Sequence, residues 1–204
     1  MEYIEFLKKL TLMSRKEYIE YLLLYKTCLV ISEVKPAVTI AFSKIKNNQY
    51  EDWCKFGINF LDTVSLDYIV LRDKEDIIIL MIYNRKLLEE VINKKENRSF
   101  LKYFGYYSIN LESNLKILKN RYDKYNCPHE IGIFLGIPVE EVRAFIESSG
   151  NNYIESRYWK VFVDRKKSTD IFKRYDFIRK YTISSIINGF SLSKVIFLIK
   201  ENLY

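Results

Sequence analysis

Apolar residues recur every three to four positions over most of the chain, which is the spacing of one face of an α-helix. Two helices are expected within residues 1–30, because Ser14 and Glu17 stand at the spacing of a capping box and begin the second one. Further helices are predicted at residues 49–61, 85–105, 111–124 and 168–188, with a last one that Ser191 begins.

Shorter apolar runs interrupt the helical spacing and predict strands. Lys35-Pro36 ends the early helices, because a residue before proline avoids helical backbone angles. A charged turn joins the second and third runs, as in a hairpin, and the fourth run alternates between apolar and polar residues. The predicted strands are residues 37–43, 68–71, 77–83 and 159–163.

The order of these elements predicts an α/β or α+β fold, namely a helix-rich single domain over residues 1–204. We expect a small sheet of three to five strands flanked by helices. With 204 residues, 49% hydrophobic and 29% charged, the chain can bury a full core. This composition excludes a disordered protein and a disulfide-rich scaffold.

Several features indicate a cytoplasmic protein. The longest uncharged stretch, residues 181–193, is too short and too polar to span a membrane, so no membrane partner is expected. The first residues lack the basic and apolar regions of a secretion signal. Cys28, Cys54 and Cys127 form no closely spaced pair, which fits reduced thiols better than disulfides or a structural zinc site.

The net charge of +7 is not spread evenly. Residues 1–155 hold 22 basic and 22 acidic side chains, whereas residues 156–180 hold nine basic and three acidic ones. Such a local field can select an acidic partner, either an acidic protein such as a flavodoxin-like one or, less favoured, a nucleic acid. A solvated helix face is the alternative. The candidate partner-binding residues are Arg157, Lys160, Arg165, Lys166, Lys167, Lys173, Arg174 and Lys180.

Rare residues are concentrated between Cys127 and Gly150, where the only histidine stands. Pro128 suits the first position of a helix, which would place His129 and Glu130 in the first turn, near free backbone N–H groups. The positive end of a helix dipole favours a neutral imidazole, the form that binds haem iron or a metal or accepts a proton. An ordinary helix start explains the same residues. His129 is the only candidate imidazole, so a metal site made by the protein alone lacks ligands.

Residues 127–150 are also similar to a helix-turn-helix unit, with a glycine at the turn. A helix that reads DNA should be basic or rich in amides, because it approaches phosphates and base edges. Here the second helix carries Glu140, Glu141 and Glu147 against a single Arg143. We therefore expect the shape of this unit without the DNA-reading task.

No phosphate-binding loop, dinucleotide-binding glycine motif or zinc-protease motif occurs in the sequence. Ordinary nucleotide-dependent catalysis is therefore not expected, and the sequence leaves open whether the protein is an enzyme. Tyr153, Tyr158 and Trp159 interleave with basic residues, as a surface that stacks nucleic-acid bases would. A half-buried strand gives the same alternation.

Two segments resemble the signatures of a family of proteins of unknown function from clostridia and related anaerobes. PHEIGIFLG, at residues 128–136, is similar to the family's Phe-Pro-His-Glu-Ile-Gly-x-Phe-Leu-Gly, and the segment at residues 28–43 contains its Lys-Pro-Ala. The resemblance implies a cytosolic protein of anaerobes, in the company of flavodoxins and iron-handling proteins. The matching positions are Lys35, Pro36, Ala37, Pro128, His129, Glu130, Gly132, Phe134, Leu135, Gly136, Pro138, Trp159 and Lys160.

Two functional hypotheses follow. The first is a redox- or iron-linked accessory or binding protein, in which His129, with Glu130 and Lys35, holds haem, iron or an anion at a helix N-terminus. The second is a docking module whose basic segment binds an acidic protein or a nucleic acid.

Overall fold

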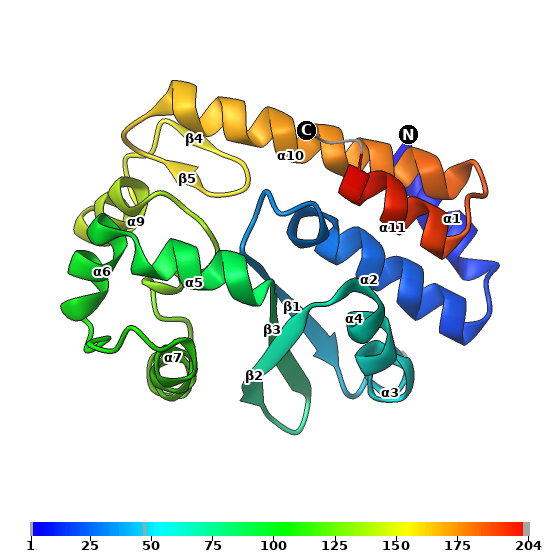
Figure 1. The fold of residues 1–204 in the computed structure, drawn as a ribbon, viewed down its shortest axis with the longest axis horizontal. Coiled ribbons are helices and arrows are strands. Elements are labelled where there is room, and N and C mark those ends of the chain that lie inside the picture. Colours follow the sequence, from blue (N-terminus) through cyan, green and yellow to red (C-terminus); the bar gives the residue numbers. More distant parts are fainter. Residues whose placement is uncertain (1, 47, 202–204) are drawn as a thin grey trace.

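The computed structural model describes residues 2–46 and 48–201, and its elements follow the predicted order (Figure 1). The strands are β1 (Ala37–Ser43), β2 (Asp67–Asp73), β3 (Ile77–Tyr83), β4 (Glu155–Ser156) and β5 (Lys160–Val161). The helices are α1 (Glu2–Thr11), α2 (Arg15–Ile31), α3 (Gln49–Asp52), the π-helical η1 (Trp53–Gly57), α4 (Ile58–Val64), α5 (Arg85–Asn93), α6 (Lys95–Lys102), α7 (Leu111–Tyr125), α8 (Ile131–Phe134), α9 (Val139–Glu147), α10 (Arg165–Ile187) and α11 (Leu192–Glu201).

The central sheet has three antiparallel strands in the order β1-β3-β2, so β3 is hydrogen-bonded on both sides. Because successive side chains of a strand point to opposite faces, Ile40 and Leu80 lie in one apolar core and Ala37 and Met81 lie in another. The almost continuous apolar sequence of β3 suits a strand that is covered on both faces. The fold is α+β, with a small antiparallel sheet flanked by helices, as the sequence predicts.

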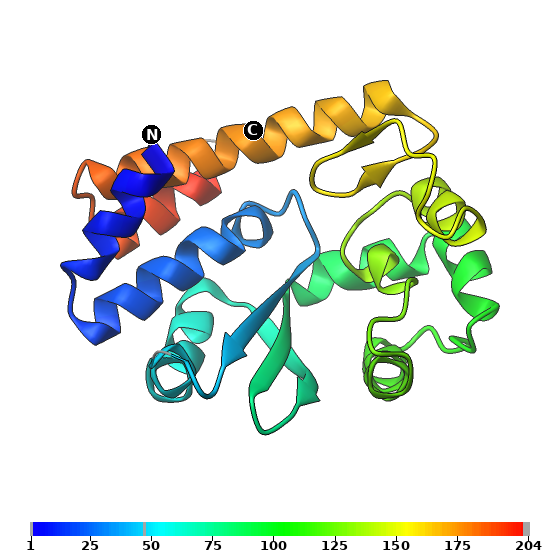
Figure 2. The same ribbon diagram turned by 180° about the vertical axis from the view of Figure 1, so that it is seen from behind.

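Two groups of helices cover the two faces of the sheet. On one face α2 packs against β1 and also contacts α1, α10 and α11. On the other face lie α5, α7 and α8, whose buried residues include Leu88, Leu115 and Phe134. The long helix α10 runs along one edge of the molecule, from the β4–β5 hairpin to α1 and α11 (Figures 1 and 2). It therefore connects parts of the chain that are far apart in sequence.

Local signals at the helix ends are confirmed. Ser14 and Glu17 form the expected reciprocal capping box of α2. Asp164 caps α10 by accepting the backbone N–H of Lys167, and this helix begins three residues earlier than predicted. In the part of the chain that the structure describes, no helix combines the length and the apolarity that crossing a membrane requires.

Two local predictions are wrong. Only Lys160 and Val161 of the predicted strand at 159–163 form a strand, β5. The helix expected from Pro128 is the single turn α8, so His129 and Glu130 lie in the turn before it. The backbone N–H groups of residues 131–133 bond three residues back, as in a 3₁₀ turn. Gly136, with a φ of +76°, then ends α8.

The buried carboxylate of Glu141 on α9 connects this region to α10. It accepts backbone N–H groups from Phe162 at 2.6 Å, Val163 at 3.2 Å and Asp164 at 3.0 Å. Hydrogen bonds to an ionised group are worth more than neutral ones, and the carboxylate itself is buried, so it needs these donors. Glu141 thus holds the segment that leads into α10.

Replacing Glu141 with Gln should lower the free energy of unfolding by about 2 kcal/mol, because an amide accepts at only one of its two ends. Urea unfolding followed by circular dichroism measures the loss. Glu140→Gln is the matched control: Glu140 pairs with Lys167 at 2.7 Å on the surface, and its replacement should cost less than about 1 kcal/mol. Equal losses for the two variants would contradict this role of Glu141.

Candidate functional site

Glu130 is not available to a cofactor. It is buried, forms an ion pair with Arg121 of α7, and accepts a hydrogen bond from the hydroxyl of Tyr106 at 3.1 Å. Burial and then the Glu130 charge raise the pKa of Tyr106, so this phenol stays protonated. The cluster ties the turn before α8 to α7, which is a structural role.

His129 is exposed, and its ring meets the ring of Phe145 at an angle, with 5.1 Å between centroids. It lines a cavity of about 250 Å³, which we call the Trp159 cavity because Trp159 also lines it. Neither Glu130 nor Lys35 lines it. This volume lies below the range of roughly 300–1,000 Å³ that ligand pockets occupy, so haem does not fit there. Among the described residues, no three His, Cys, Asp or Glu side chains gather as metal ligands.

Lys35 lies elsewhere, with its Nζ 5.8 Å from the centre of the Tyr175 ring on α10. Burial, reinforced by the charge of Arg179, lowers the pKa of Lys35 to about 8. The two sequence signatures nevertheless meet, because Gly136 packs directly on Pro36: a Cβ at position 136 would stand 2.6 Å from the Pro36 ring. The structure therefore joins the signatures through packing and does not bring His129, Glu130 and Lys35 into one cavity.

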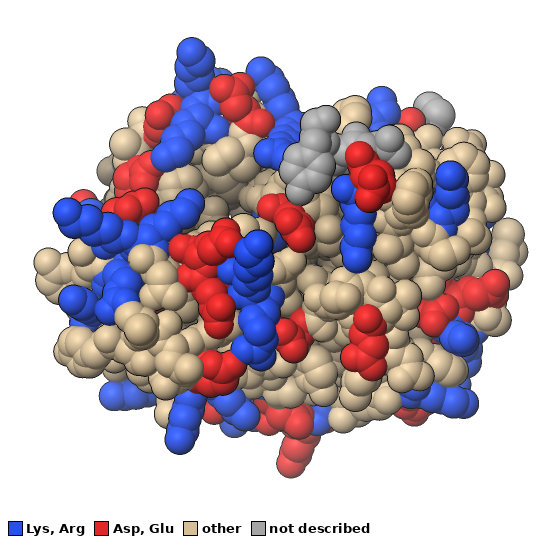
Figure 3. Space-filling model, in the orientation of Figure 1, with Lys and Arg blue, Asp and Glu red and all other residues tan. Residues whose placement is uncertain are grey.

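Several side chains of the predicted basic segment already have partners within the chain, mostly in ion pairs at its surface. Arg157 pairs with Asp176, Arg165 with Glu155, Lys167 with Glu140 and Lys173 with Asp170, whereas the Nζ of Lys160 donates to the Gly150 carbonyl at 2.8 Å. Figure 3 shows basic and acidic side chains interleaved near α10. Within the described chain, Lys166, Arg174 and Lys180 form no ion pair.

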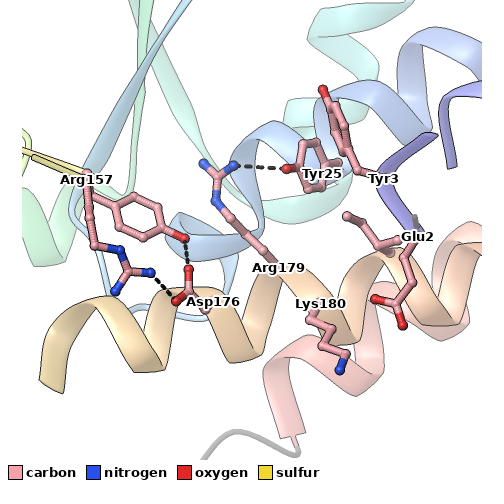
Figure 4. A pocket seen from close by; sticks show the side chains of 9 residues that line it. Glu2, Tyr3, Tyr25, Arg157, Asp176, Arg179 and Lys180 are labelled. Atoms are coloured by element: carbon pink, nitrogen blue, oxygen red, sulfur yellow. Dashed lines mark hydrogen bonds and ion pairs between the residues drawn. The ribbon is translucent and has the colours of Figure 1, made fainter. Parts of the chain in front are cut away.

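A larger depression of about 780 Å³, open to the surface, lies between α1, α2, α10 and the β4–β5 hairpin (Figure 4). Arg179 extends into it from α10, and we call it the Arg179 pocket. The Nη1 atom of Arg179 donates to the hydroxyl of Tyr25 at 3.1 Å, and the guanidinium lies 5.2 Å from the Tyr25 ring centre and 5.5 Å from that of Tyr158. Its Nε is buried and has no hydrogen-bond partner among the described residues.

One acidic side chain of this pocket, Asp176, is already engaged. It accepts the hydroxyl of Tyr158 at 2.9 Å and pairs with Arg157. Burial and the bond to Asp176 raise the pKa of Tyr158. In the described chain Arg179 forms no ion pair with a carboxylate, including Glu2, the other acidic residue that lines the pocket; its hydrogen-bond and ring partners are Tyr25 and Tyr158.

Other positive charges surround Arg179. The pKa values of Lys26 and Lys35 are both lowered, first by burial and then by the charge of Arg179. Burial also raises the pKa of the Cys28 thiol to about 11, so this cysteine contributes no thiolate to offset the cations. Lys26, Lys35 and Arg179 therefore repel one another and pair with no carboxylate of the described chain, although neither lysine lines the Arg179 pocket.

The sequence places Arg179 in the basic segment but does not single it out. Its principal partner, Tyr25, lies 154 residues away, and the tyrosines at residues 18–25 have the spacing of a core stripe. A usable signal exists: Arg179 stands four residues after the buried Tyr175, at the border of the inner face of α10. A basic residue at the edge of the buried face of a helix can be partly buried, and is therefore a candidate site residue.

Comparison with known proteins places the chain in a family. A family model described as "Protein of unknown function (DUF3793)" matches residues 23–196. No curated protein and no solved structure matches the chain. The matched range contains Tyr25, Lys35, Tyr158 and Arg179, whereas α1, which contributes Glu2 and Tyr3 to the pocket, precedes it.

Replacing Lys35 with Met should raise the free energy of unfolding at pH 7 by up to about 3 kcal/mol, because the folded protein carries a charged amine that is costly to bury. Between pH 8 and pH 10.5 the unfolded state keeps the Lys35 proton and the folded state loses it, so the free energy of unfolding of the wild-type protein rises with pH. The advantage of Lys35→Met in free energy of unfolding therefore shrinks over this range. Urea unfolding at pH 7 and pH 9.5 measures the difference. Lys74→Met, at an exposed turn, should show no such pH-dependent difference. If Lys35→Met raised the free energy of unfolding by the same amount at pH 7 and pH 9.5, the lowered pKa of Lys35 would be contradicted.

Proposed function

The chain belongs to this family of proteins of unknown function, whose model covers residues 23–196, and we propose that it binds a small organic phosphate in the Arg179 pocket. The observation that carries the proposal is the semi-buried guanidinium of Arg179, which has no carboxylate partner in the described chain and keeps an orphaned Nε. Burying a charge is costly unless it is paired, so an anionic ligand would complete the site.

The surroundings of Arg179 favour a phosphate over a single carboxylate. A phosphate monoester carries close to two negative charges at neutral pH. The charged lining of the pocket comprises the cations Arg157, Arg179 and Lys180 and the carboxylates Glu2 and Asp176, and Asp176 is already engaged by Arg157 and Tyr158. Arginine binds planar or tetrahedral oxyanions through its N–H groups. The Nε of Arg179 is itself buried, so a ligand in the pocket would bind the Nη atoms.

The same pocket offers faces for a flat ring. Tyr3, Tyr25 and Tyr158 all line it. Aromatic side chains can stack on a planar ligand whatever hydrogen-bonding groups that ligand carries. It is an open depression of about 780 Å³, so a small organic phosphate would bind there with part of its surface in water. A phosphate attached to a planar group is therefore the ligand class that fits.

A redox-linked accessory role in the cytoplasm of an anaerobe is a narrower form of this proposal. A phosphorylated redox cofactor belongs to the ligand class above and agrees with the link to flavodoxins that the sequence resemblance implies. Haem or iron held by His129 is not part of it, because the Trp159 cavity is too small for haem and Glu130 is committed to Arg121.

Docking of an acidic protein is a second candidate function. It is favoured by the exposed cations Lys166, Arg174 and Lys180, which have no ion-pair partner within the described chain. Arg174 and Lys180 lie on α10, next to the pocket, where a steering field would act on an anionic partner.

Flavin mononucleotide and adenosine monophosphate should bind the protein and raise its melting temperature, whereas riboflavin and adenosine should bind more weakly because they lack the phosphate. Arg179→Gln should weaken binding of the phosphates about tenfold or more, the loss expected for charge-assisted hydrogen bonds. Calorimetric titration measures the affinities.

The matched control for this experiment is Lys180→Gln, since Lys180 lines the same pocket but is exposed. It should change affinity less than about threefold, as expected for a screened surface charge. Undiminished phosphate binding by a folded Arg179→Gln protein would exclude the proposed site.

Docking predicts a different pattern. Replacing Arg174 and Lys180 with Gln should weaken binding to an immobilised flavodoxin and reduce the dependence of that binding on salt. The control replaces Lys86 and Lys119, which are also exposed but lie on α5 and α7. Surface plasmon resonance at low and physiological salt measures both. Equal weakening by the two double variants would indicate a general effect of charge, and a nucleic-acid probe that competes with flavodoxin would point to the other acidic partner.

A further inference from the structure

A second group of basic residues lies on and around helices α6 and α7. Residues 94–126 hold eight basic and three acidic side chains. One of these acids, Glu112, already pairs with Arg85 of α5. Helices α6, α7 and α9 lie together at one end of the molecule (Figures 1 and 2). The even charge balance of residues 1–155 as a whole hides this local excess, which attracts polyanions.

The connection between α6 and α7 exposes two large rings. Tyr103 is 83% exposed and Tyr107 is 72% exposed, and neither stacks on another ring or on a cation among the described residues. Between them, Tyr106 is buried and donates its hydroxyl to Glu130 at 3.1 Å, which anchors the connection. Rings that protrude from an anchored loop lose little entropy when they bind a partner, so they suit recognition.

Beside this connection, aromatic rings and cations lie next to one another in a row. The guanidinium of Arg143 on α9 lies 5.7 Å from the ring centre of Phe100, and 5.2 Å separates the ring centres of Phe100 and Phe104. The guanidinium of Arg121 on α7 lies 5.2 Å from the ring centre of Phe104 and 4.8 Å from that of Tyr125. The row thus runs from α9 across the end of α6 to α7.

Tyr103 and Arg143 share an open groove of about 250 Å³ next to this row. The lining of the groove comprises Phe100, Tyr103, Phe104, Arg143, Ile146 and Glu147. Arg143 is exposed and pairs with no carboxylate of the described chain, including Glu147 in the same groove. A planar group stacked on Tyr103 would therefore lie beside a guanidinium that has no ion-pair partner in the described chain. We call the surface formed by Tyr103, Phe104, Arg121, Lys124, Tyr125 and Arg143 the α6–α7 platform.

Exposed cations stand next to the exposed rings. Lys102 directly precedes Tyr103, and the Nζ of Lys124 lies 5.1 Å from the ring centre of Tyr125, which is 49% exposed. Both lysines are exposed and form no ion pair within the described chain. Arg121 differs, because its charge is balanced by the buried Glu130. The two lysines and Arg143 are therefore the groups that would meet the phosphates of a polyanion.

We propose that the α6–α7 platform binds single-stranded nucleic acid, with bases stacked on Tyr103 and Tyr125 and phosphates at Lys102, Lys124 and Arg143. An unpaired strand presents both flat base faces and a regular series of charges, so it uses rings and cations together. A duplex hides its base faces, and an acidic protein segment supplies the charge without a series of flat rings. The platform shares no lining residue with the Arg179 pocket, so the proposal does not depend on the organic-phosphate site.

Fluorescence anisotropy with labelled RNA tests the proposal. Oligoadenylate and oligouridylate strands of about 12 nucleotides, without terminal phosphates, should bind with dissociation constants below about 100 µM at physiological salt. The duplex formed by the same two strands should bind about fivefold or more weakly, because its bases are not free to stack on the rings. Unlabelled oligoadenylate should displace the labelled strand, whereas poly-L-glutamate at the same concentration of charges should displace it poorly.

The contribution of stacking is measured with an exposed ring. Tyr103→Ala should weaken oligoadenylate binding about fivefold or more, the loss expected for one stacked base. Because Tyr103 is so exposed, circular dichroism should show an unchanged fold. Phe197→Ala is the matched control: it removes a ring that is 54% exposed on α11, outside the platform, and should change the affinity less than about twofold.

The contribution of charge is measured by the dependence of binding on salt. Replacing Lys102 and Arg143 with Gln should reduce the slope of log affinity against log salt by about 1.4, as expected for two lost phosphate contacts. The control replaces Lys74 and Lys86, which are exposed on the β2–β3 turn and on α5, and should leave the slope unchanged. Arg179→Gln should also leave oligonucleotide binding unchanged.

Four results would overturn the proposal: neither strand binds, the duplex binds as tightly as the single strands, Tyr103→Ala has no larger effect than Phe197→Ala, or Arg179→Gln abolishes binding. Displacement by poly-L-glutamate as effective as that by RNA would also overturn it, in favour of an acidic protein partner. Failure of phosphate binding at Arg179 would leave these expectations as they stand.

Discussion

A three-stranded sheet that is covered on both faces needs two separate layers of helices, and each layer in this protein has its own apolar core. The central strand β3 contributes to both, with Leu80 in one core and Met81 in the other. Because the two layers are separated by the sheet, they meet only around its edges. The long helix α10 runs along one edge of the molecule, and the Arg179 pocket and the Trp159 cavity lie where α10 or the β4–β5 hairpin before it faces other elements.

The distribution of charge separates structural ion pairs from the candidate site. Glu130 and Glu141 are buried carboxylates whose partners are an arginine, a tyrosine and three backbone N–H groups, so both hold distant segments together. Arg179 is the contrasting case, a semi-buried cation whose neighbours are tyrosines and other cations. Satisfied buried charges indicate architecture, whereas an unsatisfied one in a cavity indicates a ligand.

The hairpin of β4 and β5 places two different chemical environments side by side. Arg157 and Tyr158 face the electropositive Arg179 pocket, and Trp159 and Lys160 line the smaller apolar cavity. Glu141 holds the chain immediately after this hairpin, at Phe162, so the same anchor that starts α10 also positions the wall between the cavities.

The sequence by itself determined the elements whose causes are local. Helical spacing, the Ser14–Glu17 capping box and the apolar runs at β1, β2 and β3 predicted most of the fold, because each depends on residues a few positions apart. Only the tertiary structure decided the candidate site. His129 and Glu130 are adjacent in sequence, yet Arg121 takes Glu130 and leaves His129 at another cavity, while Arg179 meets Tyr25 across 154 residues. Charge pairing acts through space, and a single sequence does not record which distant groups the folded chain brings together.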